Sequence, residues 1–288
     1  MKGNLKTLLA EKLKPEELKL VYKSYDVVGD IAIIRVPENL EHCSPIIAEA
    51  IMQTHKNVKS VWRQASPVSG DFRLRQLEFV MGERKTETIY KEHGCVFKVD
   101  LAKCYFSPRL AFERIRIARL VQPREIVVNM FAGVGTFSII IAKHSEANRV
   151  YSIEINPLAA EYMEENVRLN RVYEKVVPIC GDAEKVIKEK LQGIANRVLM
   201  PLPEKAYEFL ETAISALQNE GWIHYYAFEH AKKHENPMEK VKAKVAEKLE
   251  KMKINFDTPF SRIVRNTGPN WYQVAIDLQI KKEHKNYN

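Results

Sequence analysis

One stretch, residues 125–157, constrains the fold of this chain more than any other. Its sequence, EIVVNMFAGVGTFSIIIAKHSEANRVYSIEINP, predicts a buried strand over residues 126–130, a turn with two glycines, and an apolar helix over residues 137–143. A second strand is expected over residues 150–155. Strand, glycine turn, helix and strand in this order form half of a nucleotide-binding βαβ unit.

Two features of this stretch favour a nucleoside-containing cofactor over plain packing of a strand on a helix. Gly133 and Gly135 have no Cβ, so the backbone can turn sharply and a ligand can lie against the N–H groups at the helix N-terminus. Glu154 follows Gly133 by 21 residues, at the strand end where a carboxylate accepts hydrogen bonds from ribose hydroxyls.

The third glycine of a dinucleotide-binding turn is missing, because Ser138 occupies its position. The run F-A-G-V-G-T-F instead resembles the first motif of class I S-adenosylmethionine-dependent methyltransferases, whose cofactor has no phosphate. The resemblance implies S-adenosylmethionine as the cofactor and argues against a dehydrogenase. The cofactor-binding candidates in the turn are Phe131, Ala132, Gly133 and Gly135.

Composition narrows the class of protein further. A net charge of +8 and a pI near 9.1 indicate a polyanionic partner or a lysine-rich surface that serves solubility. The four cysteines have no CxxC or CxxH spacing, so we expect reduced thiols and no metal site. The N-terminus lacks the apolar segment of a signal peptide, and no 18 apolar residues run together. We therefore expect a soluble, cytoplasmic protein without a membrane anchor.

The residues before the cofactor unit predict a small α+β domain over residues 1–95. Its expected elements are a helix over residues 4–20 with a new turn at Pro15, a hairpin at Gly29-Asp30, a helix over residues 44–56, and a hairpin at His93-Gly94. Basic and aromatic side chains in this domain are candidates for phosphate contacts and base stacking, or form a solvated basic face. They are Trp62, Arg63, Phe72, Arg73, Arg75, Arg84 and Lys85.

From Val96 onward, strands and helices alternate as in an α/β domain, expected over residues 96–288. Helices are predicted in FERIRIARLV, LAAEYMEENVRLNRV and EKAYEFLETAISAL, and in a Lys/Glu-rich segment over residues 237–253. Strands are predicted in VVPICGDAEKV, NRVLMPLP and GWIHYYAF, and the chain closes the sheet with an antiparallel pair that turns at residues 268–270. The fold class is therefore α/β with a smaller N-terminal α+β domain, and the resemblance of the glycine turn implies that the α/β part is a Rossmann-like class I methyltransferase domain.

Segments along nearly the whole chain, from about residue 22 to 282, resemble one enzyme family. They are SYDVVGD, SGDFRLRQLE, KVDLAKCYFSPRL, VVNMFAGVGTFS, YSIEINPLA and GWIHYYAF. The family is that of the archaeal and eukaryotic tRNA (guanine-N1)-methyltransferases, which modify guanosine 37, 3′ to the anticodon. Close relatives transfer an aminocarboxypropyl group from the same cofactor in wybutosine synthesis. Larger members carry a further N-terminal domain for the tRNA outer corner, for which this chain is too short.

The resemblance implies roles for individual residues. In the family the Arg of S-P-R-L is catalytic and lies near guanine O6, a role that would fall to Arg109. A guanidinium there stabilises negative charge that develops on O6 as the N1 proton leaves. The base that takes this proton is Glu154 or Glu113. Asp182 would contact the adenine amino group, or it is only a helix N-cap.

Two positions depart from the family pattern. Asn129 replaces the acid that begins the first motif, so it can accept a hydrogen bond but carries no charge. Pro201-Leu202-Pro203 replaces an Asn-Leu-Pro or Asn-Pro-Pro segment beside the target base. Pro201 keeps a carbonyl acceptor and loses both the N–H and the side-chain donor, and it remains a candidate for the catalytic and cofactor sites.

The expected partner is the anticodon stem-loop of tRNA, and we expect a monomer with no obligate protein partner. Three functions stay open: methyl transfer to N1 of guanosine 37, aminocarboxypropyl transfer in wybutosine synthesis, and tRNA binding by a relative with weakened catalysis. The Arg of S-P-R-L is generally missing from the wybutosine transferases, so Arg109 favours methyl transfer.

Overall fold

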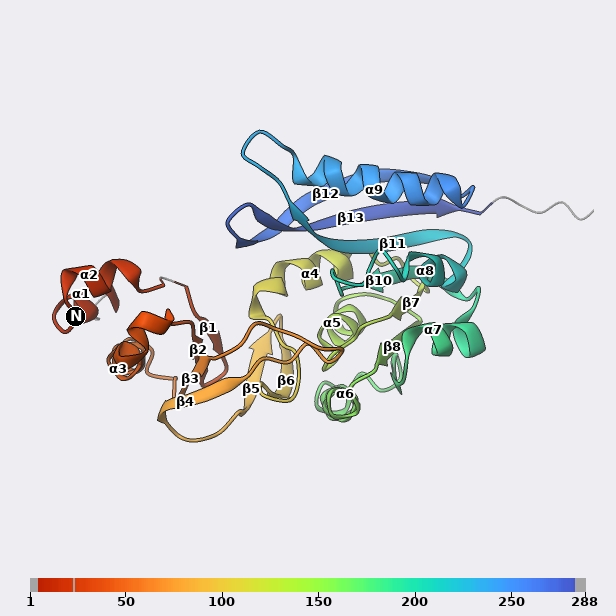
Figure 1. Ribbon diagram of the computed structural model, residues 1–288. Helices are drawn as coiled ribbons and strands as arrows, with labels where there is room; N and C mark the ends of the chain where they lie inside the picture. Colours follow the sequence, from red (N-terminus) through yellow and green to blue (C-terminus); the bar gives the residue numbers. More distant parts are fainter. Residues whose placement is uncertain (1–4, 23, 283–288) are drawn as a thin grey trace, which may run out of the picture. The chain divides into compact units, whose positions relative to one another are not determined.

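A computed structural model describes residues 5–22 and 24–282 (Figure 1), so Asn4, where the first helix was expected to begin, lies outside the described residues. Contacts divide the chain into two compact units, Met1–Pro108 and Arg109–Asn288. Among the helices of the described residues, none has the length and apolar character required to cross a bilayer.

The N-terminal unit is the expected α+β structure. A four-stranded sheet has the order β1-β2-β3-β4, with β1 at Asp26–Val28, β2 at Ile31–Ile34, β3 at Ser60–Gln64 and β4 at Leu77–Gly82. The same unit contains the helices α1 (Leu5–Ala10), α2 (Pro15–Leu20) and α3 (Ser44–Thr54), and a 3-10 segment, η1, at Glu38–Cys43. A hairpin of β5 (Glu87–Glu92) and β6 (Cys95–Asp100) follows. Both predicted hairpins, at Gly29-Asp30 and His93-Gly94, are confirmed.

The C-terminal unit contains a seven-stranded sheet of order β12-β13-β11-β10-β7-β8-β9. Five neighbouring strands are parallel: β7 (Ile126–Asn129), β8 (Arg149–Glu154), β9 (Val176–Cys180), β10 (Ala195–Met200) and β11 (Leu217–His230). The last strand, β13 (Trp271–Lys281), is antiparallel and lies between β11 and β12 (Asn255–Gly268). The predicted closing antiparallel pair is thus confirmed.

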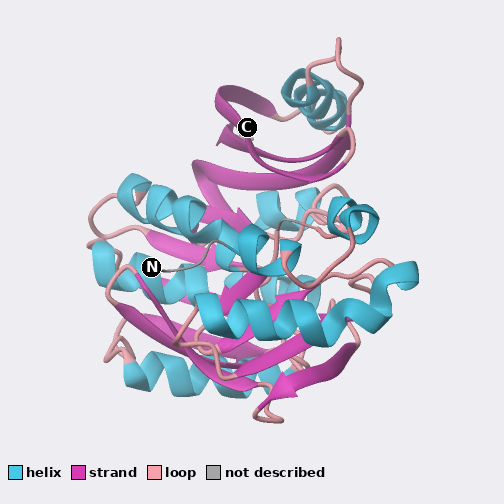
Figure 2. Ribbon diagram, turned by 90° about the vertical axis from the view of Figure 1, so that its left-hand side faces the viewer, coloured by secondary structure: helices cyan, strands magenta, loops and turns pink. Residues whose placement is uncertain are grey.

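Helices flank this sheet (Figure 2). They are α4 (Ala111–Leu120), preceded by the 3-10 turn η2 (Pro108–Leu110), and α5 (Thr136–His144), α6 (Pro157–Leu169), α7 (Ala183–Val186), α8 (Leu210–Ala216) and α9 (Pro237–Lys251). A π-helical turn, η3 (Ile187–Leu191), continues α7. Apolar residues of α7, α8 and α9 share one buried cluster with β10, β11 and β13. This burial, worth about 25 cal/mol per Å² of apolar surface, holds the helices on the sheet.

The segment after β10 differs from the prediction. The sequence EKAYEFLETAISAL suggested a helix directly after the strand, but residues 203–209 form turns and α8 begins only at Leu210. Pro201 and Pro203 have no N–H to donate, so neither can extend the strand ladder beyond β10 or donate inside a helix. The chain therefore leaves β10 through an irregular loop.

A chain of buried polar groups ties the C-terminal unit together. Arg197 contacts Glu125 at 2.8 Å and the Nε2 of His224 at 2.7 Å, and His224 Nδ1 lies 2.6 Å from Asp277. Asp277 also accepts a hydrogen bond of 2.6 Å from Arg116 on α4. Because a guanidinium only donates, His224 Nε2 must accept, so His224 is neutral and donates its Nδ1–H to Asp277. Burial lowers the pKa of His224, which also favours the neutral ring.

Candidate functional site at the carboxyl edge of the parallel strands

The glycine turn after β7 is built as the sequence predicted. The Ala132 N–H donates to the Ile153 carbonyl at 2.8 Å, which joins the turn to β8. Gly133 has a φ of 56° and Gly135 a φ of 89°, a region of backbone conformation that favours glycine. A Cβ at Gly135 would lie 2.9 Å from the Cγ of Met163 on α6. A side chain there would force the side chain of Met163, and that of Ile139 at 3.1 Å, to move.

Glu154 ends β8 next to this turn, and backbone donors hold its carboxylate. Oε2 accepts a hydrogen bond of 2.7 Å from the Gly133 N–H, and Oε1 accepts one of 2.9 Å from the Asn156 N–H. Burial raises the pKa of Glu154, although the backbone hydrogen bonds act in the opposite direction. A carboxylate can accept about four hydrogen bonds, so this group keeps acceptor sites for the two hydroxyls of a ribose.

Asn129 is fully buried. This burial gives a physical reason why an uncharged residue stands where the family has an acid. Its side-chain amide donates to the Ser138 hydroxyl at 3.1 Å, and the Ser152 hydroxyl donates to Ser138 at 2.7 Å. A carboxylate here would be a charge without a cationic partner, which is costly in a buried place. Ser138, which replaces the third glycine of a dinucleotide turn, is thus a polar link between β7, α5 and β8.

A residue outside the sequence-based candidates also supports the turn. Asn166 on α6 is buried and donates from its side chain to the Val134 carbonyl at 3.0 Å. The sequence could have indicated this residue, because Asn166 lies beside Met163 and Val167 on the apolar face of its helix. A polar residue on such a face must find a buried partner.

The other cofactor candidates lie at the same edge of the sheet. β7 and β10 are adjacent, with Asn129 opposite Leu199, and the Met130 N–H donates to the Leu199 carbonyl at 3.1 Å. Phe131 and Pro201 therefore follow the ends of neighbouring strands. The sheet order reverses between these two strands, which is where open α/β sheets bind ligands. The Phe131 ring packs edge-on against Phe209 at 5.3 Å.

Asp182 follows β9 and caps α7, with its side chain accepting a hydrogen bond of 3.0 Å from the Lys185 N–H. The N-cap reading is confirmed, and the adenine contact stays a prediction. One carboxylate can do both because the cap uses only Oδ1.

The two catalytic candidates near α4 differ in environment. Arg109 is exposed and lies in η2, directly before the helix. Glu113 is 1% exposed, and its Oε2 accepts hydrogen bonds from Tyr226 at 3.1 Å and from Arg116 at 3.0 Å. Its Oε1 lies 3.3 Å from Arg262 and accepts no hydrogen bond from the protein atoms of residues 5–22 and 24–282. Glu113 thus has one oxygen that is ion-paired but accepts no hydrogen bond, whereas each oxygen of Glu154 already accepts one from a backbone N–H.

Some of the basic and aromatic residues predicted to contact RNA in the N-terminal unit are buried or ion-paired, whereas Arg73 contacts an aromatic ring. Trp62 is buried and donates to Ser60 and to the Lys85 carbonyl, so the expectation that its ring stacks on a base is wrong. Arg63 pairs with Glu41 and Glu78, and Lys85 pairs with Asp30. Arg73 instead lies 4.0 Å over the ring of Tyr105, the first residue of Y-F-S-P-R-L.

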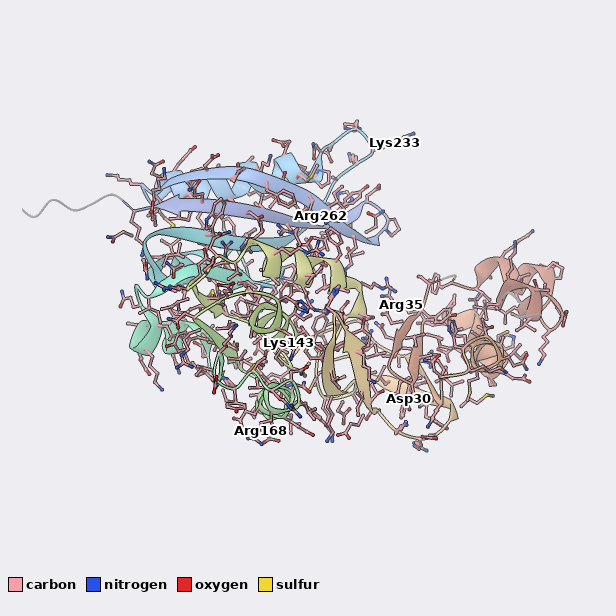
Figure 3. All side chains as sticks on the ribbon, turned by 180° about the vertical axis from the view of Figure 1, so that it is seen from behind. Asp30, Arg35, Lys143, Arg168, Lys233 and Arg262 are labelled. Atoms are coloured by element: carbon pink, nitrogen blue, oxygen red, sulfur yellow. The ribbon has the colours of Figure 1, made fainter. Side chains whose placement is uncertain are left out.

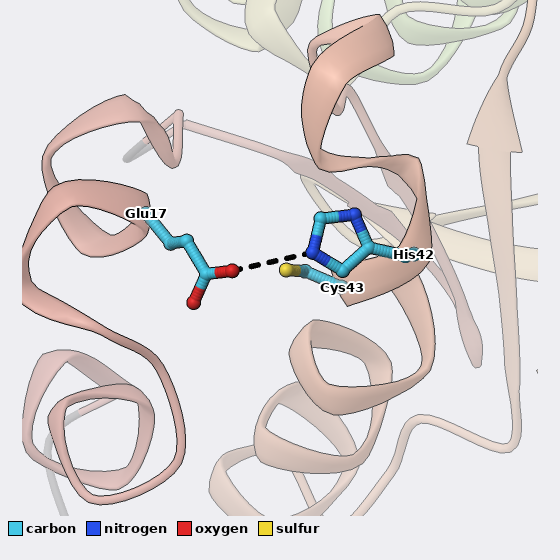
Figure 4. Close-up of side chains that lie close together, drawn as sticks. All are labelled: Glu17, His42 and Cys43. Carbon is cyan, nitrogen blue, oxygen red and sulfur yellow. Dashed lines mark hydrogen bonds and ion pairs between the residues drawn. The ribbon is translucent and has the colours of Figure 1, made fainter.

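Three side chains of the N-terminal unit have the types that bind metals (Figure 4). Glu17 and His42 form an ion pair of 3.2 Å beside the buried Cys43. Burial raises the pKa of the Cys43 thiol, which keeps it in the neutral form that binds metals poorly. All four cysteines are free thiols.

Comparison with known proteins decides the family. A family profile described as the TRM5/TYW2 methyltransferase domain matches residues 88–255, and one described as the TYW2 N-terminal domain matches residues 5–86. The chain belongs to the TRM5/TYW2 methyltransferase family. The resemblance inferred from the sequence motifs and the Rossmann-like fold class are thereby confirmed.

Two curated members of this family are similar over most of the chain. The tRNA (guanine(37)-N(1))-methyltransferase Trm5b of Pyrococcus abyssi is 42% identical over 92% of this chain and 78% of its own length. Its crystal structure matches with a TM-score of 0.85 at 40% identity, over 98% of this chain and 82% of that chain. The tRNA 4-demethylwyosine(37)-methyltransferase Taw21 of Saccharolobus solfataricus is 40% identical, over 90% of this chain and 94% of its own length.

Two other solved TRM5/TYW2 structures contain ligands. The complex of aTrm5 with tRNALeu matches with a TM-score of 0.84 at 36% identity, over 98% of this chain and 79% of that chain. TYW2 of Methanocaldococcus jannaschii in complex with AdoMet matches with a TM-score of 0.66 at 29% identity, over 90% of this chain and all of that chain.

Replacing Glu154 with Gln should weaken cofactor binding. The amide nitrogen of Gln cannot accept, so either the Gly133 or the Asn156 N–H loses its partner and a ribose acceptor is lost as well. Loss of hydrogen bonds to a charged group costs about 1.5–3 kcal/mol, or about 10- to 100-fold in Kd. Calorimetric titration with S-adenosylmethionine measures this, with the exposed Glu161→Gln on α6 as control. Equal Kd values for the two variants would contradict the ribose assignment.

Proposed function

We propose that this protein is a tRNA methyltransferase that moves a methyl group from S-adenosylmethionine to N1 of guanosine 37. The observation that carries the proposal is the Glu154 carboxylate, fixed by the Gly133 N–H at the strand end beside the glycine turn. A carboxylate in this position suits the ribose of an adenosyl cofactor. Support for the reaction comes from the Pyrococcus relative, whose name specifies it.

The residues present fit S-adenosylmethionine. The backbone of Phe131 to Gly135 would lie along the cofactor, Glu154 would accept from its ribose, and Asp182 would contact its adenine. Pro201 would border the cofactor and the target base, where its carbonyl remains an acceptor. When bound, the cofactor supplies an electrophilic methyl group, and the protein contributes mainly alignment.

The target guanine needs two protein groups. Methylation at N1 removes a proton from N1 and shifts electron density onto O6. Arg109 would donate hydrogen bonds to O6 and stabilise the charge that develops there. The proton goes to a carboxylate, and the contacts favour Glu113 over Glu154, because the Oε1 of Glu113 accepts no hydrogen bond within the described chain.

A tRNA substrate also implies how the target base reaches the site and which part of the protein contacts the RNA. Stacking in the anticodon loop covers the faces of a base and keeps it from entering a protein pocket, so guanosine 37 would turn out of the stack to react. Residues 1–95 would form the tRNA-contacting domain and residues 96–288 the catalytic domain. The net charge of +8 suits phosphate contacts with the anticodon stem-loop. We further propose that the protein acts as a cytoplasmic monomer.

A second candidate is methyl transfer to 4-demethylwyosine at position 37. The Saccharolobus relative that bears this name is 40% identical and matches over 94% of its own length. Pro201 also points this way, because an altered residue beside the target base suits an altered base. Aminocarboxypropyl transfer stays a third possibility, since a transferase of that name from Methanocaldococcus jannaschii is 34% identical.

One label-transfer experiment separates these reactions. The protein is incubated with S-adenosylmethionine labelled either in the methyl group or in the carboxyl carbon. Two RNAs are offered, a tRNA transcript with guanosine 37 and a tRNA carrying 4-demethylwyosine at that position. Methyl label on the transcript is the expected result. Methyl label only on the modified tRNA favours the second candidate, carboxyl label favours the third, and no label on either RNA contradicts all three.

A further inference from the structure

Two arginine–phenylalanine pairs connect α4 with β12 in the C-terminal unit. The Arg262 guanidinium carbon lies 4.4 Å from the ring centroid of Phe112, and that of Arg116 lies 4.5 Å from the ring centroid of Phe260. Phe112 and Arg116 come from α4, whereas Phe260 and Arg262 come from β12, on which Figure 3 labels Arg262. Each element thus provides one ring and one guanidinium to this ring cluster.

The spacing of the residues produces this arrangement. Phe112 and Arg116 are four residues apart, which places them on one face of a helix. Phe260 and Arg262 are two residues apart, which places them on one face of a strand. The helix face and the strand face meet, so each guanidinium reaches the ring of the other element.

Both arginines are held by carboxylates. Arg116 donates to Glu113 at 3.0 Å and to Asp277 at 2.6 Å, and Arg262 pairs with Glu113 at 3.3 Å. A guanidinium has five N–H donors, and the contacts to Glu113 use only part of those of Arg262. Its side chain remains 32% exposed. Arg262 is therefore a fixed planar cation with donors still available to a ligand.

The rings of this cluster remain open to solvent. Phe112 is 59% exposed and Phe260 is 37% exposed. Covering an aromatic side chain contributes about 1.5–3 kcal/mol, so an exposed ring beside a fixed guanidinium is a favourable place for a flat apolar ligand. Bases stack on aromatic rings and on arginine planes without regard to sequence.

RNA suits this surface better than a protein partner. The chain carries a net charge of +8, and a guanidinium next to a ring can stack on a base while it donates to a phosphate. Phe112 also follows Arg109 by three residues, about one helical turn, and Arg109 is the residue proposed to face the target guanine.

We propose that Phe112 and Arg262 form a stacking platform for an unpaired base of the RNA substrate, next to the target nucleotide. The proposal rests on the proposed function, because the RNA is a tRNA whose position 37 has turned out of its stack. The neighbouring anticodon-loop base, which loses a stacking partner when this happens, would find a replacement on the Phe112 ring. Phe260 and Arg116 form the second ring–guanidinium pair of the same cluster.

Replacing Phe112 with Ala tests the platform. Loss of one stacked base should raise the Kd for the tRNA transcript roughly 10-fold or more. The Kd for S-adenosylmethionine should not change. Phe112→Tyr keeps the ring and should bind tRNA as the wild type does. The matched control is Tyr173→Ala, which removes another exposed aromatic ring, of 65% exposure, between α6 and β9.

A crosslink on the unaltered protein gives a second measurement. tRNA with 4-thiouridine at position 36 or 38 should crosslink on irradiation to the peptide that contains Phe112. An unchanged tRNA Kd for Phe112→Ala, or crosslinks confined to other peptides, would overturn the platform and leave the ring free for a protein partner. If the wild type neither binds nor methylates tRNA, the proposed function fails instead, so the two failures are distinguishable.

Discussion

Replacing Arg109 with Ala should lower the single-turnover rate of methyl transfer by about 100- to 1,000-fold, the usual effect of removing one donor to a developing oxyanion. Negative charge grows on O6 as the N1 proton leaves. Without the guanidinium this charge has only solvent or weaker dipoles to stabilise it. The loss should appear in the rate at saturating tRNA, because the interaction strengthens in the transition state. Rapid-quench assays with a guanosine 37 transcript measure it.

Two further variants sharpen the Arg109 experiment. Arg109→Lys keeps the positive charge but not the planar pair of donors, so it should recover only part of the rate. Arg119→Ala, in the last turn of α4, removes an exposed arginine away from the S-P-R-L motif and should behave as wild type. A rate for Arg109→Ala within a factor of two of the Arg119→Ala rate would exclude a catalytic role for Arg109.

Replacing Asp277 with Ala should lower the free energy of unfolding by about 3–5 kcal/mol, the cost of leaving a buried charge without its partner. Asp277 is 4% exposed and accepts from both Arg116 and His224. Burial alone would raise the pKa of Asp277, but the hydrogen bonds from His224 and Arg116 and the charge of Arg116 hold it well below its usual range. Urea denaturation at neutral pH measures the difference, and Asp257→Ala on β12 removes an exposed carboxylate for comparison.

The Asp277 effect should depend on pH in a defined direction. A folded-state pKa below the unfolded value gives stability that is complete above the unfolded pKa of about 3.9 and disappears as the pH falls further. The gap between wild type and Asp277→Ala should therefore be constant near neutrality and shrink below about pH 4. A destabilisation no larger than that of Asp257→Ala would show that the buried chain contributes little.

Local patterns made much of the fold predictable. The glycine turn, Glu154 at the strand end and the closing antiparallel pair depend on residues close together in the sequence, and all three appear where expected. The contact of Arg116 with Asp277 joins residues 161 positions apart, and no local pattern encodes it. Trp62 illustrates the same limit, because a basic neighbourhood in the sequence gave no sign that its ring is buried.

The candidate site was likewise predictable only in part. Spacing from the glycine turn located Glu154, and the family resemblance implied Glu113 or Glu154 as the base, but the sequence could not rank the two carboxylates. The ranking depends on which oxygen already has a donor, and those donors come from Gly133 and Asn156 for Glu154 and from Tyr226 on a distant strand for Glu113. Likewise, Asn129 looked like a weakened cofactor contact until its buried bond to Ser138 gave it a structural role.

The place of β13 has a consequence for synthesis of the protein on the ribosome. β13 follows both β11 and β12 in the sequence, yet it lies between them in the sheet and supplies hydrogen bonds to both. Until residues 271–281 emerge, β11 has an open edge of backbone donors and acceptors, and such edges pair readily with other chains. The sheet of the catalytic unit can therefore be completed only after β13 has been made, and a nascent chain stalled before β13 is exposed to aggregation.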